Sequence, residues 1–279
     1  MTARFRFARH GRDRLREVER VLHAAYGAPE SLLGNQIDPL DEAIYIILSF
    51  QTDLRRFKET WQNLRSAFPR WEDVEAAPLK EVSAALRSGG LHRQKARAIK
   101  LLLRAVRRRF RTLSLRSLHD MSDRDAERVL TRLPGISWKG ARCVLLYSLD
   151  REVLPIDGNS FRVLQRTGVI PLSAVYRRLS LHDAIQAAIE PRLRRRFHVN
   201  LVVHGQDLCL PERPRCRACP AAQVCLKRGL RQDRTRENDA SWATGLAFAQ
   251  APTGRRAPQG GSGRRVQQKT GAQHEAAAG

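Results

Sequence analysis

Apolar residues recur at helical spacing along most of the chain. Near its start, Leu15, Val18 and Leu22 stand three or four positions apart, an interval that places them on one face of a helix over residues 14–25. Further stretches show the same spacing at about 79–87, 93–110, 123–132, 138–149, 158–167 and 181–189. Because no alternating strand pattern of useful length occurs, the sequence predicts an all-α fold.

The run AIYIIL at residues 43–48 is apolar without interruption, and by periodicity alone it fits a strand as well as a helix. The acidic pair Asp41-Glu42 precedes it, and an amphipathic pattern continues to Leu64. Acidic side chains are typical of a first helical turn. These two features favour a buried helix.

Charge is the compositional feature that narrows the function most. The chain has 51 Lys and Arg against 28 Asp and Glu, a formal net charge of +23, of which +19 falls on residues 1–229. The positive charges of so basic a folded chain repel one another, unless the chain usually binds a polyanion. Nucleic acid is the leading candidate, because contact with phosphates releases counterions. The alternative is that the positive charge only reflects an arginine-rich proteome and has no functional meaning.

The two ends of the chain differ from its middle. Residues 251–273 are rich in Gly, Gln and Arg, with almost no core-forming residues, and we predict a disordered basic tail over residues 230–279. The charged first twenty residues lack the apolar centre of a secretion signal. No apolar run approaches the length that spans a bilayer. A cytoplasmic protein without a membrane partner is therefore expected.

Two helices joined by a tight turn are expected between residues 122 and 149. Ser122 is a good N-cap residue, and the first helix runs into the sequence LPGIS before the second begins near Trp138. Gly135 permits a tight reversal within that sequence. The free amides of such a turn, beside a helix N-terminus, form a cradle for a phosphate oxygen.

Lys139 stands in the first turn of the second helix. The positive end of the helix dipole should lower its pKa, and a lysine that is partly neutral can form a Schiff base at a sugar carbon. A plain phosphate contact is the alternative. Asp157 follows after a short loop and precedes a helix, where it is expected as an N-cap. A carboxylate fixed in that way could also stabilise positive charge or help to activate the lysine.

Four of the five cysteines crowd into one short segment, at Cys209, Cys216, Cys219 and Cys225. Clustered thiols in an intracellular protein indicate metal ligands before disulfides. Their spacing allows a [4Fe–4S] cluster or a structural zinc ion, although it is not that of a paired zinc ribbon. The fifth, Cys143, is expected to be an inert buried thiol.

The segments LPGISWKGA (133–141) and PIDGNSFRV (155–163), followed by the four-cysteine loop, resemble the helix–hairpin–helix DNA glycosylases of the endonuclease III kind. The resemblance covers about residues 20–229. It implies that Lys139 and Asp157 are the catalytic pair of a DNA glycosylase and abasic-site lyase. The enzyme would extrude a damaged nucleotide, attack its C1′ carbon with the lysine and nick the strand by β-elimination. It also implies that the four cysteines hold a [4Fe–4S] cluster.

The same resemblance assigns the contacts to DNA and the lobes of the fold. The partner is double-stranded DNA with a damaged base or an abasic site, bound by a monomer. The residues implied at the DNA are Gln51, which fills the gap left by the extruded base, the apolar wedge Leu91, and Gly135, Ser137 and Gly140 of the hairpin. A barrel lobe of six helices spans 41–151, and an iron–sulfur lobe combines 1–40 with 152–229.

Some residues depart from the family pattern. Ser137 replaces the second glycine of the hairpin, so the turn must suit a residue with a side chain. After Asp157 the chain has Gly-Asn, where pyrimidine-specific endonuclease III usually has Thr-His. Asp-Gly-Asn resembles adenine DNA glycosylase, a branch that normally lacks the lysine. Base preference therefore stays open, with oxidised pyrimidines as one candidate class.

The leading hypothesis is a glycosylase with lyase activity, and two alternatives remain beside it. In a monofunctional glycosylase, Lys139 would contact phosphate while Asp157 activates water. In a non-catalytic, metal-stabilised DNA-binding protein, neither residue would have a chemical role.

Overall fold

Helices supply all the regular secondary structure in residues 5–29, 31 and 33–230, the part of the chain that the structure, a computed structural model, describes. This confirms the all-α prediction. The helices are α1 (Gly11–Tyr26), α2 (Pro39–Ser49), α3 (Leu54–Ala67), α4 (Trp71–Ala76), α5 (Leu79–Ala85), α6 (His92–Phe110), α7 (Asp123–Thr131), α8 (Trp138–Tyr147), α9 (Gly158–Thr167), α10 (Leu179–Ala187) and α11 (Arg194–Asp207). Short 3₁₀ helices are η1 (Arg87–Gly89), η2 (Arg116–Asp120) and η3 (Pro191–Leu193). The predicted tail, 230–279, lies outside the described residues from residue 231 onward.

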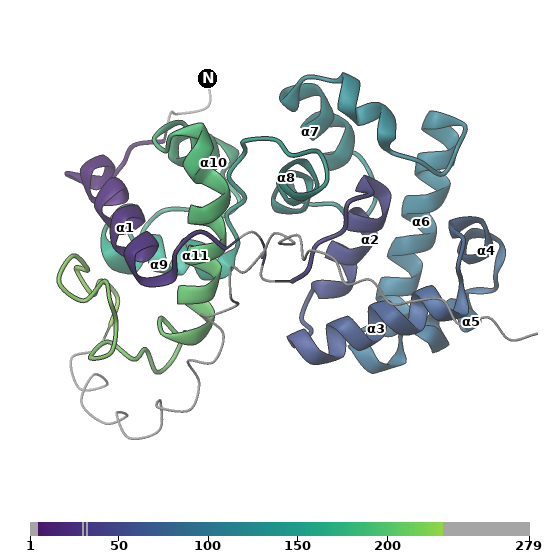
Figure 1. Cartoon of the computed structure of the whole chain (residues 1–279), viewed down its shortest axis with the longest axis horizontal. Coiled ribbons are helices and arrows are strands. Elements are labelled where there is room, and N and C mark those ends of the chain that lie inside the picture. Colours follow the sequence, from purple (N-terminus) through teal and green to yellow (C-terminus); the bar gives the residue numbers. More distant parts are fainter. Residues whose placement is uncertain (1–4, 30, 32, 231–279) are drawn as a thin grey trace, which may run out of the picture. The chain divides into compact units, whose positions relative to one another are not determined.

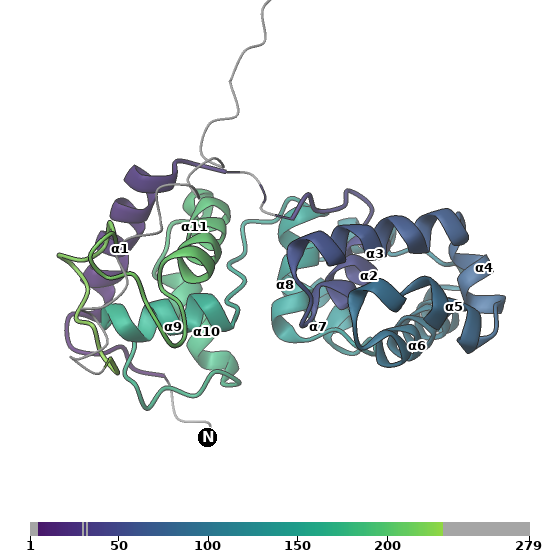
Figure 2. The same cartoon turned by 90° about the horizontal axis from the view of Figure 1, so that it is seen from below.

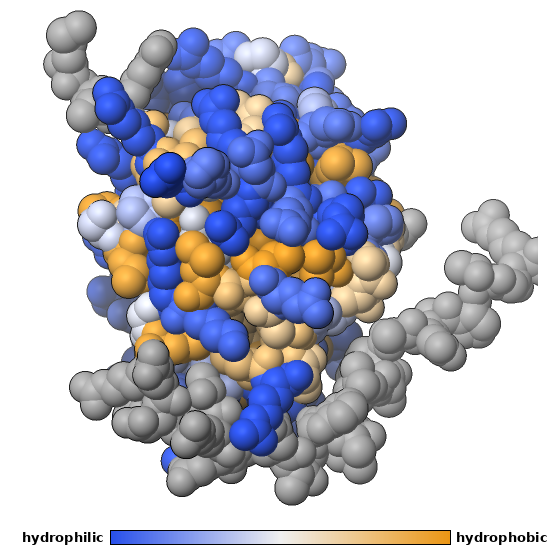
Figure 3. Space-filling model, turned by 90° about the vertical axis from the view of Figure 1, so that its left-hand side faces the viewer, coloured by the Kyte–Doolittle hydropathy of each residue, from blue (hydrophilic) through white to orange (hydrophobic). Residues whose placement is uncertain are grey.

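Two separate hydrophobic cores organise these helices into two lobes (Figure 1, Figure 2). The larger core draws its buried side chains from residues 40–153, the helices α2 to α8. The smaller core combines residues 15–22 of α1 with residues 154–201, which include α9, α10 and part of α11. On the face of the smaller lobe seen in Figure 3, hydrophilic residues cover much of the surface and apolar ones gather in a band between them. The exact lobe boundaries given above remain predictions.

The apolar run 43–48 is helical, as predicted, but its helix ends at Ser49 and does not continue to Leu64. Gln51 has a φ of 50°, in the left-handed region that interrupts a right-handed helix. Asp53 then caps a new helix, because its side chain accepts a hydrogen bond from the Arg56 N–H at 3.0 Å. Two helices with a sharp turn between them replace the single amphipathic pattern.

Helix α11 is not evident from the sequence pattern, and the reason is its position. It packs against both α1 and α9, so buried residues face several directions and no single apolar stripe marks it. Its contact with α9 is close: a Cβ placed on Gly205 would lie 2.8 Å from the Asn159 Cβ. The short helix α4 was also missed. Among the described residues, no helix is both long and apolar enough to cross a membrane.

Side-chain caps fix the helices around the hairpin where the sequence predicts them. The Ser122 hydroxyl accepts the Asp125 N–H at the start of α7, and the Asp157 carboxylate accepts the Ser160 N–H at 2.7 Å at the start of α9. Ser137 caps α8 with its hydroxyl on the Gly140 N–H at 3.2 Å. Its extended backbone, with φ at −84°, needs no glycine, which explains how a residue with a side chain is accommodated there.

Candidate active site

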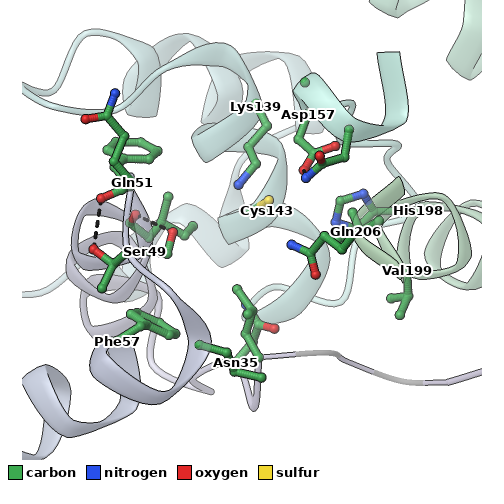
Figure 4. A pocket seen from close by; sticks show the side chains of 18 of the residues that line it. Asn35, Ser49, Gln51, Phe57, Lys139, Cys143, Asp157, His198, Val199 and Gln206 are labelled. Carbon is green, nitrogen blue, oxygen red and sulfur yellow. Dashed lines mark hydrogen bonds between the residues drawn. The ribbon is translucent and has the colours of Figure 1, made fainter. Parts of the chain in front are cut away.

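A cavity of about 520 Å³ brings together residues from distant parts of the sequence. Of the predicted site residues, Gln51, Ser137, Lys139 and Asp157 line it (Figure 4). The hairpin glycines, Leu91 and the four cysteines of the loop do not belong to its lining. The cavity thus unites the predicted catalytic pair with two predicted DNA contacts, Gln51 and Ser137.

Lys139 and Asp157 approach the centre of the cavity from two helix N-termini, those of α8 and α9 (Figure 4). Each side chain is half-buried. Asp157 is held by its cap, and its second oxygen accepts a hydrogen bond from Asn159 Nδ2 at 3.3 Å. The carboxylate is therefore fixed in orientation before anything binds.

The pKa of Lys139 is raised, which corrects the expectation that it would be lowered. Burial lowers this pKa, but the neighbouring Cys143 and Asp157, followed by Tyr176 and Glu42, raise it by more. Together these neighbouring groups outweigh the effect of burial on the pKa of Lys139. In the free protein Lys139 is protonated, so it needs to lose a proton before it can attack.

Cys143 lies one helical turn beyond Lys139, on the face of α8 that lines the cavity (Figure 4). It is buried, as predicted, and burial raises the pKa of its thiol to about 11. At neutral pH the group is a thiol rather than a reactive thiolate. Its contribution to the cavity is therefore a small, weakly polar surface beside the lysine.

His198, on α11, is a wall residue that the sequence did not indicate. It is buried, and burial lowers its pKa to about 4, so the imidazole is neutral at physiological pH. The ring hydrogen-bonds the backbone of Pro155, two residues before Asp157. Its Nδ1 has no hydrogen-bond partner among the described residues. The neutral histidine therefore contacts the loop segment before Asp157, the residue that caps α9.

Asn35 enters the cavity from the segment that connects α1 to α2. Its Nδ2 donates to Glu42 Oε1 at 2.5 Å, and the Gln36 N–H donates to Glu42 Oε2 at 2.7 Å. Glu42 is fully buried, and burial raises its pKa to about 8. This arrangement explains the acid at the start of α2, because Glu42 holds the connecting segment in place. Nothing in the sequence marks Asn35 as a cavity residue.

The hairpin turn has two glycines in different situations. Gly135 is exposed, with φ at 82°, and a Cβ there would lie 3.1 Å from Ile47 Cδ1. Gly140 is buried in α8, and its N–H is engaged with Ser137. Gly135 therefore has the exposure and the left-handed backbone that suit a turn for binding the DNA backbone. The contacts of Gly135, Ser137 and Gly140 with DNA stay predictions.

Gln51 and Leu91, the two residues predicted to enter the DNA, share an unusual backbone. Both have positive φ, 50° and 47° respectively, a conformation that costs free energy in residues with side chains. Leu91 is 46% exposed although it is apolar. Strained backbone and an exposed leucine are features that collect at functional sites, and the sequence pattern alone does not reveal them.

The four-cysteine loop offers a set of sulfur donors at Cys209, Cys216, Cys219 and Cys225. All four thiols are half-buried. Burial is the main cause that raises the pKa of Cys219 to about 12, and the other three cysteines of the loop add to it. In the described residues, however, no three His, Cys, Asp or Glu side chains converge closely enough to hold a metal ion. Cys219 Sγ instead lies 3.6 Å from His204 Nε2, and Cys209 Sγ lies 3.4 Å from Arg166. The four thiols therefore fit a thiolate-ligated group in donor type, but their side chains do not converge on a common centre.

Comparisons with known proteins place this fold. A model of the HhH-GPD superfamily of base excision DNA repair proteins matches residues 44–181. ROS1 of Arabidopsis thaliana, a DNA glycosylase/AP lyase, is 28% identical over 170 residues, which are 56% of this chain and 12% of ROS1. The chain thus spans a small part of that relative's length. Endonuclease III of Bacillus subtilis is 25% identical over 197 residues, 71% of this chain and 84% of that protein.

The fold is similar to that of solved structures. A non-covalent complex of endonuclease III with DNA superposes with a TM-score of 0.68 at 21% identity, covering 77% of this chain and 95% of that chain. The family match covers the hairpin, the predicted catalytic pair and most of the larger lobe. The chain therefore belongs to the helix–hairpin–helix (HhH-GPD) superfamily of base excision DNA repair proteins and has the fold of its endonuclease III-like members.

Proposed function

We propose that the protein is a DNA glycosylase with abasic-site lyase activity, in which Lys139 is the nucleophile and Asp157 the electrostatic partner. The observation that carries the proposal is their meeting in one cavity with Gln51. The cavity volume of about 520 Å³ suits a single extruded nucleotide. The relatives named endonuclease III and DNA glycosylase/AP lyase support the same activity.

In this proposal Lys139 Nζ attacks C1′ of the extruded nucleotide. The C1′–N bond breaks, and the base leaves with the electron pair and a proton. The sugar ring then opens: the C1′–O4′ bond breaks, O4′ takes up a proton, and an imine forms between Nζ and C1′. This imine acidifies C2′, so that loss of a C2′ proton expels the 3′ phosphate and nicks the strand. Hydrolysis of the imine restores the lysine. Asp157 stabilises the positive charge on the sugar and accepts the lysine proton that must leave first.

Borohydride trapping tests this mechanism, because borohydride reduces the imine to a stable amine. The substrate is a duplex with an abasic site, and the proteins are the wild type and Lys139→Ala. We expect a covalent protein–DNA adduct with the wild type and none with the variant. A wild type that binds this duplex but forms no adduct would refute the lyase activity.

The raised pKa of Lys139 specifically favours a second candidate, a monofunctional glycosylase. A lysine that stays protonated would contact a phosphate, while Asp157 activates water. In that case Lys139→Ala would still release a base, for example thymine glycol, from duplex DNA. Retained base release without strand nicking in both proteins would support this candidate over the first.

We also propose that Cys209, Cys216, Cys219 and Cys225 hold a [4Fe–4S] cluster, with structural zinc as the alternative. Bound there, the group would fix the loop, whose arginines Arg213, Arg215 and Arg217 add positive charge beside it. Iron, sulfide and zinc analysis of the purified protein separates the two metals. Loss of bound iron in Cys219→Ser, with the fold of the rest retained, is the expected result.

A further inference from the structure

The backbone that carries Gln51 and the backbone that carries Leu91 meet at a single buried lysine. Lys95 is 4% exposed and lies in the first turn of α6. Its Nζ donates to the Leu48 carbonyl at 2.8 Å and to the Gly89 carbonyl at 2.9 Å. Leu48 stands three residues before Gln51, and Gly89 stands two residues before Leu91. One ammonium group therefore bridges the approaches to both exposed turns.

A threonine completes this connection. Lys95 Nζ also donates to Thr52 Oγ1, and the Thr52 hydroxyl lies 2.8 Å from the Gly89 carbonyl, to which it donates. The three N–H bonds of the ammonium thus have three oxygen acceptors. Within the described part of the chain, no carboxylate lies at ion-pair distance from Lys95. A buried cation held only by neutral oxygens is costly, which indicates that its bonding geometry is needed.

The two turns also need an external support. Gln51 and Leu91 have φ of 50° and 47°, and such backbone persists only where surrounding contacts determine it. The second turn is held from its other side by α3, where Thr60 Oγ1 lies 3.0 Å from Ser88 Oγ. Lys95 is the contact that joins this turn to the first one.

We propose that Lys95 is a positioning residue that fixes the Gln51 and Leu91 turns relative to each other, so that both enter the DNA duplex together. The proposal deepens the function given above and rests on it. A nucleotide leaves the base stack at a cost of about a few kcal/mol. If the two turns are held at a fixed spacing, they can fill the gap left by that nucleotide from both sides and so offset the cost. Lys95 itself does not line the cavity, although its partner Thr52 does.

Lys100 provides a matched control on the same helix. It is 8% exposed, and its Nζ donates to three carbonyls, those of Val74 at 3.1 Å, Glu75 at 2.8 Å and Ala77. Burial lowers the pKa of both lysines. Lys100 closes the C-terminus of α4 and touches neither exposed turn. Replacement of either lysine by methionine removes the same number of hydrogen bonds, and only the partners differ.

The test measures DNA unstacking in the full-length protein. The probe is a duplex with a tetrahydrofuran abasic analogue opposite 2-aminopurine, whose fluorescence rises when it loses stacking. We expect Lys100→Met to give the wild-type rise and wild-type affinity. Lys95→Met should bind about tenfold more weakly and give a smaller rise at saturation. Lys95→Gln, which keeps two N–H donors, should fall between Lys95→Met and the wild type. It also serves as the test variant if the methionine variant does not fold.

Equal affinity and equal fluorescence for the two methionine variants, at similar thermal stability, would overturn the role of Lys95. So would a wild-type rise with Lys95→Gln if Lys95→Met fails to fold. Borohydride trapping of the wild type on abasic DNA is measured in parallel. A wild type that fails to trap defeats the lyase proposal alone. A wild type that traps normally, together with an unchanged rise in the Lys95 variants, defeats the positioning role alone.

Discussion

At the scale of single residues, Asp157 combines two tasks that substitutions can separate. Its carboxylate caps α9 and also lies beside Lys139 in the cavity. Asparagine caps helices about as well as aspartate but carries no charge. Asp157→Asn should therefore keep the stability of the wild type, whereas Asp157→Ala should lose about 1 kcal/mol of unfolding free energy.

Both Asp157 variants should lose lesion-processing rate, by about a hundredfold, because the charge is absent in each. Urea denaturation and single-turnover trapping on abasic DNA measure the two effects independently. If Asp157→Asn kept full trapping activity, the carboxylate would be a cap only.

Glu42 should make stability depend on pH. Its pKa is about 8 in the folded protein and near its ordinary value of 4.5 when unfolded. Between these values the folded state binds the proton more tightly, so its contribution is fully present below about pH 4.5 and is lost as the pH rises to about 8. Relative to Glu42→Gln, the wild type should lose stability on the order of a few kcal/mol across this range.

Urea unfolding of the wild type and Glu42→Gln at several pH values checks this. Histidines that titrate in the same window are common to both proteins, so their effects cancel in the difference. A difference in unfolding free energy that is the same at pH 5 and pH 8 would contradict the assignment to Glu42.

How far the sequence determined the site differs from residue to residue. The cap at Asp157 could be predicted from its local pattern, whereas the placement of Lys139 and Asp157 in one site followed from the family resemblance alone. The pKa of Lys139 could not be predicted in direction, because it depends on Cys143, Tyr176 and other groups that only the fold brings near. Asn35 and His198 were missed for a similar reason. Their roles come from long-range contacts rather than from local pattern.

At the scale of elements, the hairpin should distinguish its two glycines. Gly135→Ala forces a side chain into left-handed backbone, with its Cβ 3.1 Å from Ile47 Cδ1, and should cost about 1–2 kcal/mol. In Gly140→Ala the new Cβ would meet its nearest atom at 3.5 Å, an ordinary contact, within a helix. That variant should be as stable as the wild type or up to about 1 kcal/mol more stable.

Thermal unfolding compares these two variants, and binding of an abasic-analogue duplex follows the hairpin itself. Because the Gly140 amide is already bonded to Ser137, Gly140→Ala should keep wild-type affinity. A marked loss of affinity in this variant, with normal stability, would show that DNA competes for that amide.

The elements that the sequence predicted well are those with one buried face and a clear end. Helix α9 was expected at 158–167 and is found there, because Asp157 begins it and Gly168, with φ at 81°, ends it. The break at residues 50–53 was missed because no glycine or proline marks it, although Gln51 has left-handed backbone. Helix α11 lacks a single apolar face, since α1 and α9 cover different sides of it.

At the scale of the whole molecule, the excess positive charge should appear as salt-dependent DNA binding. A second cavity, of about 530 Å³, lies between α5 and the start of α6, directly after Leu91. Its cationic lining residues are Lys80, Arg87, Arg93 and Arg97, none of which forms an ion pair with another described residue. Unpaired cations beside the predicted wedge are suited to backbone phosphates.

Replacement of Arg87, Arg93 and Arg97 by glutamine should reduce the slope of log Kd against log salt concentration by about 0.9 for each phosphate that the protein no longer neutralises. Fluorescence anisotropy with an undamaged duplex measures the slope. The control replaces Arg108, Arg109 and Arg111, at the opposite end of α6. A slope that changes equally in both triple variants would indicate general attraction rather than phosphate binding in this cavity.

The two cores also differ in how the chain reaches them. The larger core is one continuous stretch, residues 40–153, so all of it has left the ribosome well before synthesis ends. The smaller core cannot close until α11 is made, because α1 packs against α9 and α11. Arg14 Nη1 even donates to the Val224 carbonyl, 210 residues later, at 2.9 Å. Helix α1 is therefore synthesised long before its packing partners α9 and α11, and the cavity wall that α11 supplies forms only after the residues of the larger core are complete.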